Sequence, residues 1–393
     1  MFKGQYVFSQ ITDHLPLHTF RRCVERYHGE RYVKQFRCFD QYLAMSFAQL
    51  THRESLRDIE ACLKAQSSKL YHMGLRSSIS RSTLADANEQ RDWRIYADFA
   101  QALIKIARPL YAGDELGLDL KNTVYALDAS TIDLCFSVFP WALFRSTKSA
   151  VKLHTLLDLR GNIPSFIHIS EGKLHDVNAL DMIIPEAGSF YVMDRAYLDF
   201  ERLFSLNNSG AFFVIRSKNN ILFKRRYSSP VEKTNGIRCD QTIRLTGLNT
   251  KNKYPKPLRR VKYHDNETNK TLNLLTNNEI IPAQTVADLY RYRWKVELFF
   301  KWIKQHLHIR TFFGTSENAL KSQIWIAISV YVLIAIIKKQ LKIKAELYTI
   351  LQVLSLTLFE KIPLEQLLGN SHYMEHTREN AIQLNLFDYL TGH

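Results

Sequence analysis

Four polar side chains recur at helical spacing in the last third of the chain. Tyr290, Arg293, Glu297 and Lys304 are separated by three, four and seven residues. At about 100° per residue these steps place them on one helical face. A carboxylate between a phenol and two cations suits a divalent metal ion held against a phosphodiester, with Glu297 as a ligand and the cations on neighbouring phosphates. The alternative is an amphipathic helix with a solvated polar face. In either case Trp294 and Trp302 are expected in the core or its flank.

Two aspartates further upstream each follow a short apolar segment. Asp128 follows residues 123–127, and Asp194 follows residues 189–193. If these segments pair as strands, the two carboxylates converge at the strand ends and repel each other unless a divalent cation binds between them. Either aspartate alone is explained as well by a helix cap or a turn. The pair, followed by the helix of Glu297, indicates metal binding.

The spacing Tyr-x2-Arg-x3-Glu-x6-Lys after two strand-end aspartates resembles that of bacterial insertion-sequence transposases of the DDE type, in the branch named after insertion sequence 4. The resemblance implies that Asp128, Asp194 and Glu297 hold two Mg²⁺ or Mn²⁺ ions. It also implies that Tyr290, Arg293 and Lys304 hold DNA phosphates beside the bond that is cut. We further expect a homodimer that holds the terminal inverted repeats of the element together in a synaptic complex.

The elements that must position the three acids read as an RNase H-like core. Residues 151–159 and 163–169 are β-branched and aromatic segments joined by Arg160-Gly161-Asn162, which predicts a hairpin. A helix over 177–184, a helix over 199–206 and a strand over 211–216 complete a β-β-β-α-β-α-β order. We therefore expect an α/β fold, with a mixed sheet flanked by helices.

Positive charge is concentrated between residues 216 and 262. This segment holds 14 lysines and arginines against two acids, whereas the formal net charge of the whole chain is +15. Short β-like segments broken by Gly, Asn and Pro predict a basic, β-rich insertion over 217–281. Such a surface attracts double-stranded DNA in a salt-dependent manner, and the basic residues predicted to contact DNA are Lys224, Arg225, Arg226, Arg259 and Arg260. Solubility alone does not explain this segment, because it does not require charge of one sign to be concentrated in one place. A membrane surface is also disfavoured, because no amphipathic basic helix or lipidation motif accompanies the charge.

The first 115 residues show helical rather than strand periodicity. Apolar residues recur at three- and four-residue spacing over 39–49, 56–65 and 82–103, and a Ser or Thr near residue 80 can cap the last helix. Four arginines near its start, at positions 76, 81, 91 and 94, resemble those of a helix that docks on DNA, so Arg81 is predicted to contact DNA. A plain helical bundle is the alternative. The resemblance implies a terminal-repeat-binding region over 1–115.

The remaining boundaries follow from these elements. The catalytic core comprises 116–216 and 282–368, and the second part carries the Glu297 helix and C-terminal helices. A tail over 369–393 contains a motif that resembles the peptide by which bacterial proteins dock on the replication sliding clamp, formed by Gln383, Leu384, Leu386 and Phe387. Packing of the motif onto the protein itself is the alternative.

Several other classes of protein are disfavoured. The apolar segment 324–337 is shorter than the about 20 residues that cross a bilayer and predicts a helix buried against the sheet. The N-terminus lacks the apolar core of a signal peptide, so we expect a cytoplasmic, nucleoid-associated protein. Five unpaired cysteines and 14 histidines form no disulfide, zinc or HExxH pattern, and there is no Walker loop. His154 and the His175-Asp176 pair match recurrent positions of the family, although packing or capping explains them equally well.

The sequence therefore predicts a DNA transposase that binds element ends, cleaves DNA and transfers strands by metal-dependent chemistry at Asp128, Asp194 and Glu297. One alternative is an RNase H-like nuclease or resolvase that cuts without strand transfer. The other is a catalytically inactive DNA-binding protein derived from a transposase.

Overall fold

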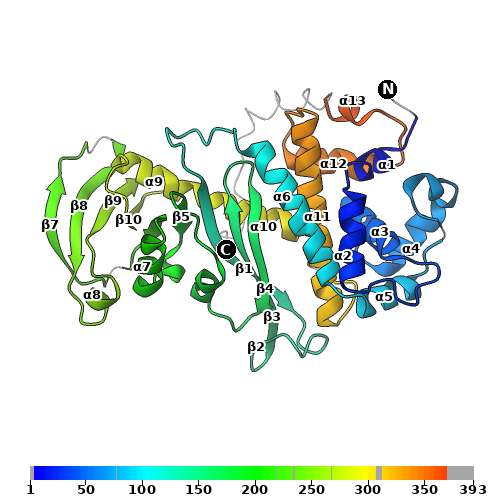
Figure 1. Ribbon diagram of the computed structural model, residues 1–393, viewed down its shortest axis with the longest axis horizontal. Helices are drawn as coiled ribbons and strands as arrows, with labels where there is room; N and C mark the ends of the chain where they lie inside the picture. The colour runs from blue at the N-terminus through cyan, green and yellow to red at the C-terminus, as the bar shows by residue number, and fades with distance from the viewer. Residues whose placement is uncertain are drawn as a thin grey trace, which may run out of the picture.

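The molecule is elongated, with helices gathered at one end and strands at the other (Figure 1). The computed structural model describes residues 4–76, 78–218, 220–232, 235–266, 268–306 and 312–369. The helical N-terminal region forms one end, and the strands that follow residue 222 form the other. The strands between residues 124 and 216 lie between the two ends; Asp128 lies within one of them and Asp194 directly follows another.

The N-terminal region is helical, as the sequence predicts. Its helices are α1 (Val7–Thr12), α2 (Leu17–Arg26), α3 (Cys38–Leu50), α4 (Leu56–Ala65), α5 (Arg81–Gln90) and α6 (Arg94–Tyr111), with single 3-10 turns at Ser67–Lys69 and Tyr71–Met73. Ser80 caps α5, because its hydroxyl accepts a hydrogen bond from the amide of Thr83 at 3.2 Å.

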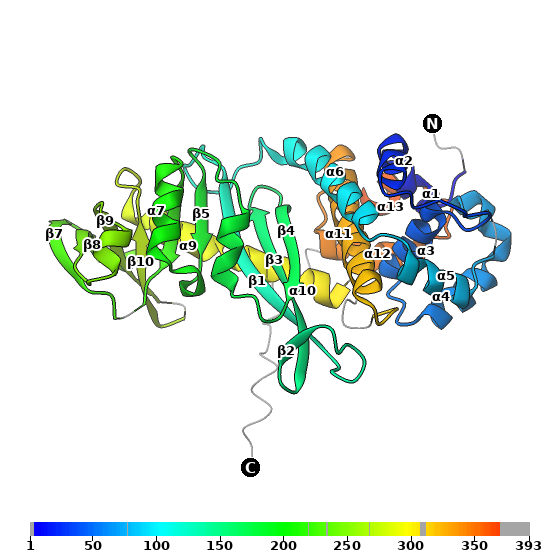
Figure 2. The ribbon, with the colours of Figure 1, turned by 60° about the horizontal axis from the view of Figure 1, so that its bottom comes forward.

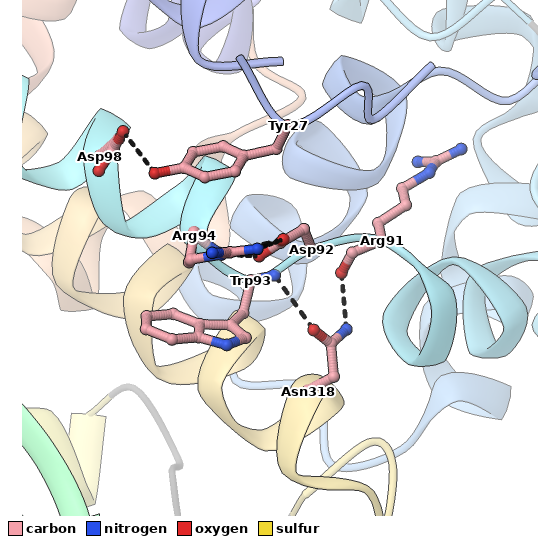
Figure 3. Close-up of polar contacts among 7 residues, drawn as sticks. All are labelled: Tyr27, Arg91, Asp92, Trp93, Arg94, Asp98 and Asn318. Carbon is pink, nitrogen blue, oxygen red and sulfur yellow. Dashed lines mark hydrogen bonds and ion pairs between the residues drawn. The ribbon is translucent and has the colours of Figure 1, made fainter. Parts of the chain in front are cut away.

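The single helix predicted over 82–103 is wrong, because the chain leaves the helix between α5 and α6. Asn318, in the first turn of a later helix, forms hydrogen bonds to the backbone at this break. Its side-chain amide donates to the carbonyls of Asn88 and Arg91, and its oxygen accepts from the amide of Trp93 (Figure 3). The backbone groups released by the break are thus satisfied by one side chain from elsewhere in the chain.

The central strands form the predicted mixed sheet. They are β1 (Val124–Leu134), β2 (Leu143–Arg145), β3 (Lys148–Asp158), β4 (Ile163–Glu171), β5 (Phe190–Met193) and β6 (Phe212–Arg216). β3 pairs antiparallel with β1, β2 and β4, whereas β1, β5 and β6 run parallel. The hairpin between β3 and β4 turns at Gly161, whose φ is +73° and where a Cβ atom would lie 2.2 Å from the ring of Tyr111, so glycine is required there.

The crossover elements differ in one respect from the prediction. Residues 177–184 were expected to form an α-helix, but the structure has a 3-10 helix, η3 (Asp176–Met182), followed by a second one, η4 (Arg195–Tyr197), after β5. The next helix, α7 (Phe200–Asn208), agrees with the prediction and is capped by Asp199, whose carboxylate accepts from the amides of Glu201 and Arg202.

The basic insertion extends the same sheet rather than forming a separate one. Its strands are β7 (Phe223–Ser229), β8 (Ile237–Leu245), β9 (Leu258–Asp265) and β10 (Lys270–Thr276), with a short helix α8 (Thr250–Lys253). β10 pairs antiparallel with β6, so the strand order is β2-β3-β1-β5-β6-β10-β9-β8-β7, with β4 on the outer side of β3. The ten strands form one continuous surface, with β7 at its edge.

The C-terminal part of the described chain is helical. It comprises α9 (Ala283–Tyr292), α10 (Trp294–His306), α11 (Glu317–Gln340), α12 (Leu347–Thr357) and α13 (Leu364–Gly369). By length and composition alone, α11 could cross a membrane. However, 94% of its apolar 18-residue stretch is buried within the protein. It packs mainly against α6, with further contacts to α3, α5 and β4, so it joins the N-terminal helices to the sheet instead of lying only on the sheet. Figure 2 shows α6 and α11 side by side between these two parts.

Candidate active site

Register and side-chain parity place Asp128 and Asp194 on the same face of the sheet. Leu127 of β1 is the register partner of Met193 of β5, and each aspartate is the next residue in its chain. Side chains alternate between the two faces of a strand. Val124, Ala126, Phe190 and Val192 belong to the hydrophobic cluster that includes α9 and α10, whereas Leu127 and Met193 belong to the cluster around α7. The two aspartates therefore face α9 and α10.

The helix predicted around Glu297 is divided at Arg293. α9 ends at Tyr292 and α10 begins at Trp294, while Arg293 keeps a helical backbone with φ −52° and ψ −32°. Two backbone hydrogen bonds at the junction join residues three apart, as in a 3-10 helix: the amide of Arg293 donates to the carbonyl of Tyr290, and the amide of Val296 donates to the carbonyl of Arg293. Because the junction is a single turn of this tighter helix, the polar side chains before and after it point in nearly the same direction.

All four residues of the predicted polar face contact groups around the aspartates. The hydroxyl of Tyr290 donates to Asp194 Oδ1 at 3.4 Å. Arg293 donates from Nη1 to Asp128 Oδ2 at 2.8 Å and from Nη2 to Glu297 Oε1 at 2.5 Å. Lys304 Nζ donates to the carbonyl oxygen of Thr131, three residues beyond Asp128 in β1, at 2.5 Å. The three acids and the four-residue motif thus form one site.

The electrostatics of Asp128 reflect this convergence. Its pKa is raised to about 6, first because the carboxyl group is buried. The Arg293 guanidinium and a hydrogen bond from the amide of Ala129 oppose the rise, whereas the negative charges of Glu297 and Asp194 add to it. An acid that is buried among other acids is a favourable place for an added cation.

The carboxylates of Asp128, Asp194 and Glu297 are chemically suitable ligands for a divalent metal ion. Carboxylate oxygens are the ligands that Mg²⁺ and Mn²⁺ prefer. Three buried polar atoms near the acids also have no hydrogen-bond partner among the described residues: Arg293 Nε, Thr155 Oγ1 and Tyr197 Oη. Thr155 is the register partner of Asp128 in β3, and the nearby charges of Asp128 and Asp194 add to the rise in the pKa of Tyr197 that burial begins. Buried polar atoms without partners point to a further group that belongs at the site.

The carboxylates are nevertheless not arranged as a finished metal site. Within the described part of the chain, no group of three or more His, Cys, Asp or Glu side chains lies close enough to hold a metal ion. The Arg293 guanidinium lies between Asp128 and Glu297 and forms an ion pair with each, so two carboxylates share one positive charge. The cation at this position is an arginine side chain.

His154 and Asp176, which the resemblance also indicated, do not join the three acids. His154 pairs in register with Ala129, next to Asp128, so it points to the opposite face of the sheet. It is fully buried, shares a hydrogen bond with Ser170 at 2.9 Å, and burial lowers its pKa to about 4. Asp176 forms an ion pair with Lys152 at 3.0 Å. Both therefore have packing or structural contacts of their own.

Residues that the sequence did not single out also border the site. A cleft beside Asp194 is lined by the cationic side chains of Arg195, Arg216 and Lys218. Arg195 directly follows Asp194, and Arg216 ends β6, the parallel strand next to β5, so their places in the chain could have indicated them. Trp294 was expected in the core or its flank, but its side chain is 57% exposed, one turn before Glu297.

The basic residues predicted to bind DNA divide into two groups. Lys224, Arg225 and Arg226 are exposed on the edge strand β7. Arg259 is instead buried in an ion pair with Asp240, at 2.7 Å, and donates to the carbonyl of Ile281, so its assignment to the DNA surface is wrong. Arg260 is half-buried and donates to Gln241 and Asn273 while lying over the ring of Phe223. β7 lies six strand spacings from β1, roughly 29 Å at about 4.8 Å each.

The N-terminal arginines also divide. Arg81 is exposed in the first turn of α5. Arg91 is buried and donates to Gln41 and to the carbonyl of Arg37, and Arg94 is held by Asp92 while its guanidinium lies over Tyr27 (Figure 3). Arg91 therefore lacks the exposure that the DNA-docking hypothesis requires, whereas Arg81 and Arg94 are exposed, Arg94 in an ion pair with Asp92. The motif of Gln383, Leu384, Leu386 and Phe387 lies outside the described residues.

Comparisons with known families cover most of the chain. Residues 119–333, more than half of the 393 residues, match the transposase DDE domain family. Asp128, Asp194 and Glu297 all fall inside this match. Residues 3–76 match a domain of unknown function, DUF4372.

Individual relatives give the same result. The chain is 31% identical over 285 residues to the candidate transposase y4zB of Sinorhizobium fredii. The aligned region covers 71% of this chain and 77% of that protein. It is 32% identical over 218 residues to the candidate transposase of insertion sequence element IS5377 from Geobacillus stearothermophilus, covering 55% of this chain and 57% of that one. Among solved structures, the piggyBac transposase synaptic complex with hairpin DNA resembles it over 96% of this chain and 81% of that one, at 12% identity and a TM-score of 0.44, which is too low to establish a common fold.

Proposed function

The chain belongs to the family of DDE transposases, which cleave DNA and transfer its strands, and on that premise we propose that Asp128, Asp194 and Glu297 are its catalytic carboxylates. The predicted DDE-type membership is confirmed, whereas its place in the branch named after insertion sequence 4 stays a prediction. Membership favours a transposase over the nuclease and the inactive DNA-binding protein that the sequence left open. The observation that carries the assignment is the shared face of β1 and β5, on which Asp194 contacts Tyr290 of α9 and Asp128 is joined through Arg293 to Glu297 of α10.

The family implies the use of a divalent metal ion, and we assign two Mg²⁺ or Mn²⁺ ions to these three carboxylates. Bound there, such ions would lower the pKa of the attacking water and stabilise the leaving 3′ oxygen. The three side chains would bind and orient them, since Asp128 lies in β1, Asp194 directly follows the neighbouring strand β5, and Glu297 lies on α10, which packs against β1. The freed 3′ hydroxyl would then replace water as the nucleophile in strand transfer.

The cations around the acids would position DNA. Arg293 and Lys304 would hold phosphates beside the bond that is cut, with Tyr290 as a further hydrogen-bond donor. The cleft of Arg195, Arg216 and Lys218 continues from Asp194 toward the insertion and would carry the next phosphates. Lys224, Arg225 and Arg226 would contact the same duplex roughly eight to nine base pairs away, at about 3.4 Å per pair. Exposed Trp294 would meet DNA bases or sugars next to Glu297.

The proposed partners follow from this reaction. They are the terminal inverted repeats of the element, read with the help of Arg81 and the N-terminal helices, and target DNA. A homodimer would hold two ends in a synaptic complex. The tail motif would dock on the replication sliding clamp, and the protein would act in the bacterial cytoplasm on the nucleoid.

A joining assay tests the proposed function. The protein is incubated with Mg²⁺ and labelled duplexes taken from the DNA that flanks its open reading frame, where inverted repeats are expected. Cleavage at the repeat ends followed by joining of the 3′ ends to a target plasmid supports the proposal. Cleavage without joining indicates a nuclease or resolvase, and binding without cleavage indicates an inactive derivative.

A further inference from the structure

Arg293 occupies an unusual position for a residue that should bind DNA. Its Nη1 and Nη2 atoms are committed to carboxylates on two different elements, Asp128 of β1 and Glu297 of α10. The Arg293 side chain is only 17% exposed, and its Nε atom has no partner among the described residues. A guanidinium in this state cannot also form a bidentate pair with a phosphate.

On the basis of the proposed function, we propose that Arg293 is an internal stand-in for the metal: in the metal-free protein its guanidinium occupies the place between Asp128 and Glu297 that a divalent cation takes, and metal entry releases the arginine toward a DNA phosphate. The two carboxylates are only partly exposed and lie on facing elements, so they repel each other unless a counter-charge lies between them. Arg293 supplies that charge until a metal ion replaces it.

The contacts around Arg293 make such an exchange feasible. The unpartnered Nε atom leaves one buried donor unsatisfied, so the arginine fits this position less completely than an ion that needs only oxygen ligands. Its backbone lies in the turn between α9 and α10, and the ring of Tyr290 is 5.9 Å from its guanidinium carbon. The side chain can therefore leave both acids by rotation about its own bonds, while Asp128 and Glu297 stay on their packed elements.

The exchange predicts that arginine and metal ion compete. We expect the substitution Arg293→Met, which removes the charge and keeps the length, to tighten Mn²⁺ binding by at least about fivefold in calorimetry on the full chain without DNA. The matched control is Arg195→Met, which removes a positive charge from the cleft next to Asp194 without touching the place between Asp128 and Glu297. If general electrostatics were the cause, both variants would bind Mn²⁺ more tightly to the same extent, and that result would overturn the proposal. Unchanged or weaker binding in Arg293→Met would overturn it as well.

A second measurement uses the unaltered protein, so that it does not depend on the folding of a variant. Phenylglyoxal modifies accessible arginines, and mass spectrometry reports its rate at Arg293. We expect the rate to rise severalfold when Mg²⁺ is added, with no rise at buried Arg259. If Mg²⁺ binds but the rate at Arg293 does not change, the exchange is wrong and the metal site stands. If Mn²⁺ binding is equally tight in Asp128→Asn and the unaltered protein, the metal site itself is wrong, and the proposed function fails with it.

Discussion

Asp128 and Asp194 stand one residue beyond a register pair of two parallel strands, Leu127 of β1 and Met193 of β5. Their carboxylates consequently leave the sheet at the same level and on the same face. The polar edge of α9 and α10 reaches both of them, through Tyr290 to Asp194 and through Arg293 to Asp128. Sheet register and helix packing together bring three acids from distant parts of the chain to one place.

Removal of any one acid should stop the chemistry and spare DNA binding. We expect Asp128→Asn, Asp194→Asn and Glu297→Gln each to lower the rate of strand cleavage at least about a thousandfold, because each loses a ligand worth several kcal/mol in the transition state. Cleavage is measured on labelled end duplexes with Mg²⁺ or Mn²⁺. A variant that still nicks in a metal-dependent manner would remove its residue from the assignment, and a parallel gel-shift experiment controls for folding.

Stability should depend on pH through Asp128. Its pKa in the folded protein, about 6, is higher than the ordinary value of 3.8, so between these values the folded state holds a proton that the unfolded state has lost. This contribution makes the protein more stable at pH 4.5 than at pH 7.5, by about 2 kcal/mol, and the advantage is lost as the pH rises through 6. Urea unfolding in EDTA at both pH values, for the unaltered protein and Asp128→Asn, isolates the contribution. Equal pH dependence of the two proteins would contradict it.

The fold was predictable where local pattern decides it. The strand and turn residues of the β3–β4 hairpin, the apolar periodicity of α3 and α4, and the cap at Ser80 are all properties of short segments. The spacing of Tyr290, Arg293, Glu297 and Lys304 likewise specified the polar face. The break at Arg91 was not predictable, because it depends on Asn318, which lies 227 residues away in the chain.

The same limit applies to individual charges. Arg259 and Arg260 are adjacent basic residues in a basic segment, and no local feature marks one of them as buried. Arg259 is buried because it forms an ion pair with Asp240, which lies 19 residues earlier and is brought next to it by the pairing of β8 and β9. The position of Arg293 between two acids was equally invisible, since it depends on how α9 and α10 lie against β1.

The basic residues should therefore separate by substitution. Replacing Lys224, Arg225 and Arg226 by alanine should weaken DNA binding and lower the slope of log affinity against log salt by up to about 2.7, or about 0.9 for each phosphate that the protein no longer neutralises. Binding titrations at several salt concentrations measure this. Thermal stability should barely change, because all three side chains are exposed.

Arg259→Ala should show the reverse pattern. It leaves Asp240 buried without its partner, which destabilises the protein by about 3–5 kcal/mol in denaturant unfolding. The salt slope of DNA binding should be unchanged at temperatures where the variant is folded. A lowered slope with unaltered stability would instead return Arg259 to the DNA surface.

The tail motif makes a prediction that is independent of the active site. The double substitution Leu386→Ala and Phe387→Ala should abolish pull-down by the replication sliding clamp, because it removes the apolar side chains expected to enter the clamp's pocket. Strand cleavage on end duplexes should be unaffected. Undiminished pull-down would mean that the motif does not mediate docking.

The most direct test is the location of bound metal. Crystals of the protein with Mn²⁺ and an element-end duplex, measured at a wavelength where manganese scatters anomalously, show the ions without reference to activity. The account predicts anomalous peaks at about 2.0–2.3 Å from carboxylate oxygens of Asp128, Asp194 and Glu297, with the Arg293 guanidinium displaced from the acids. Manganese bound elsewhere, with Arg293 still between Asp128 and Glu297, would contradict it.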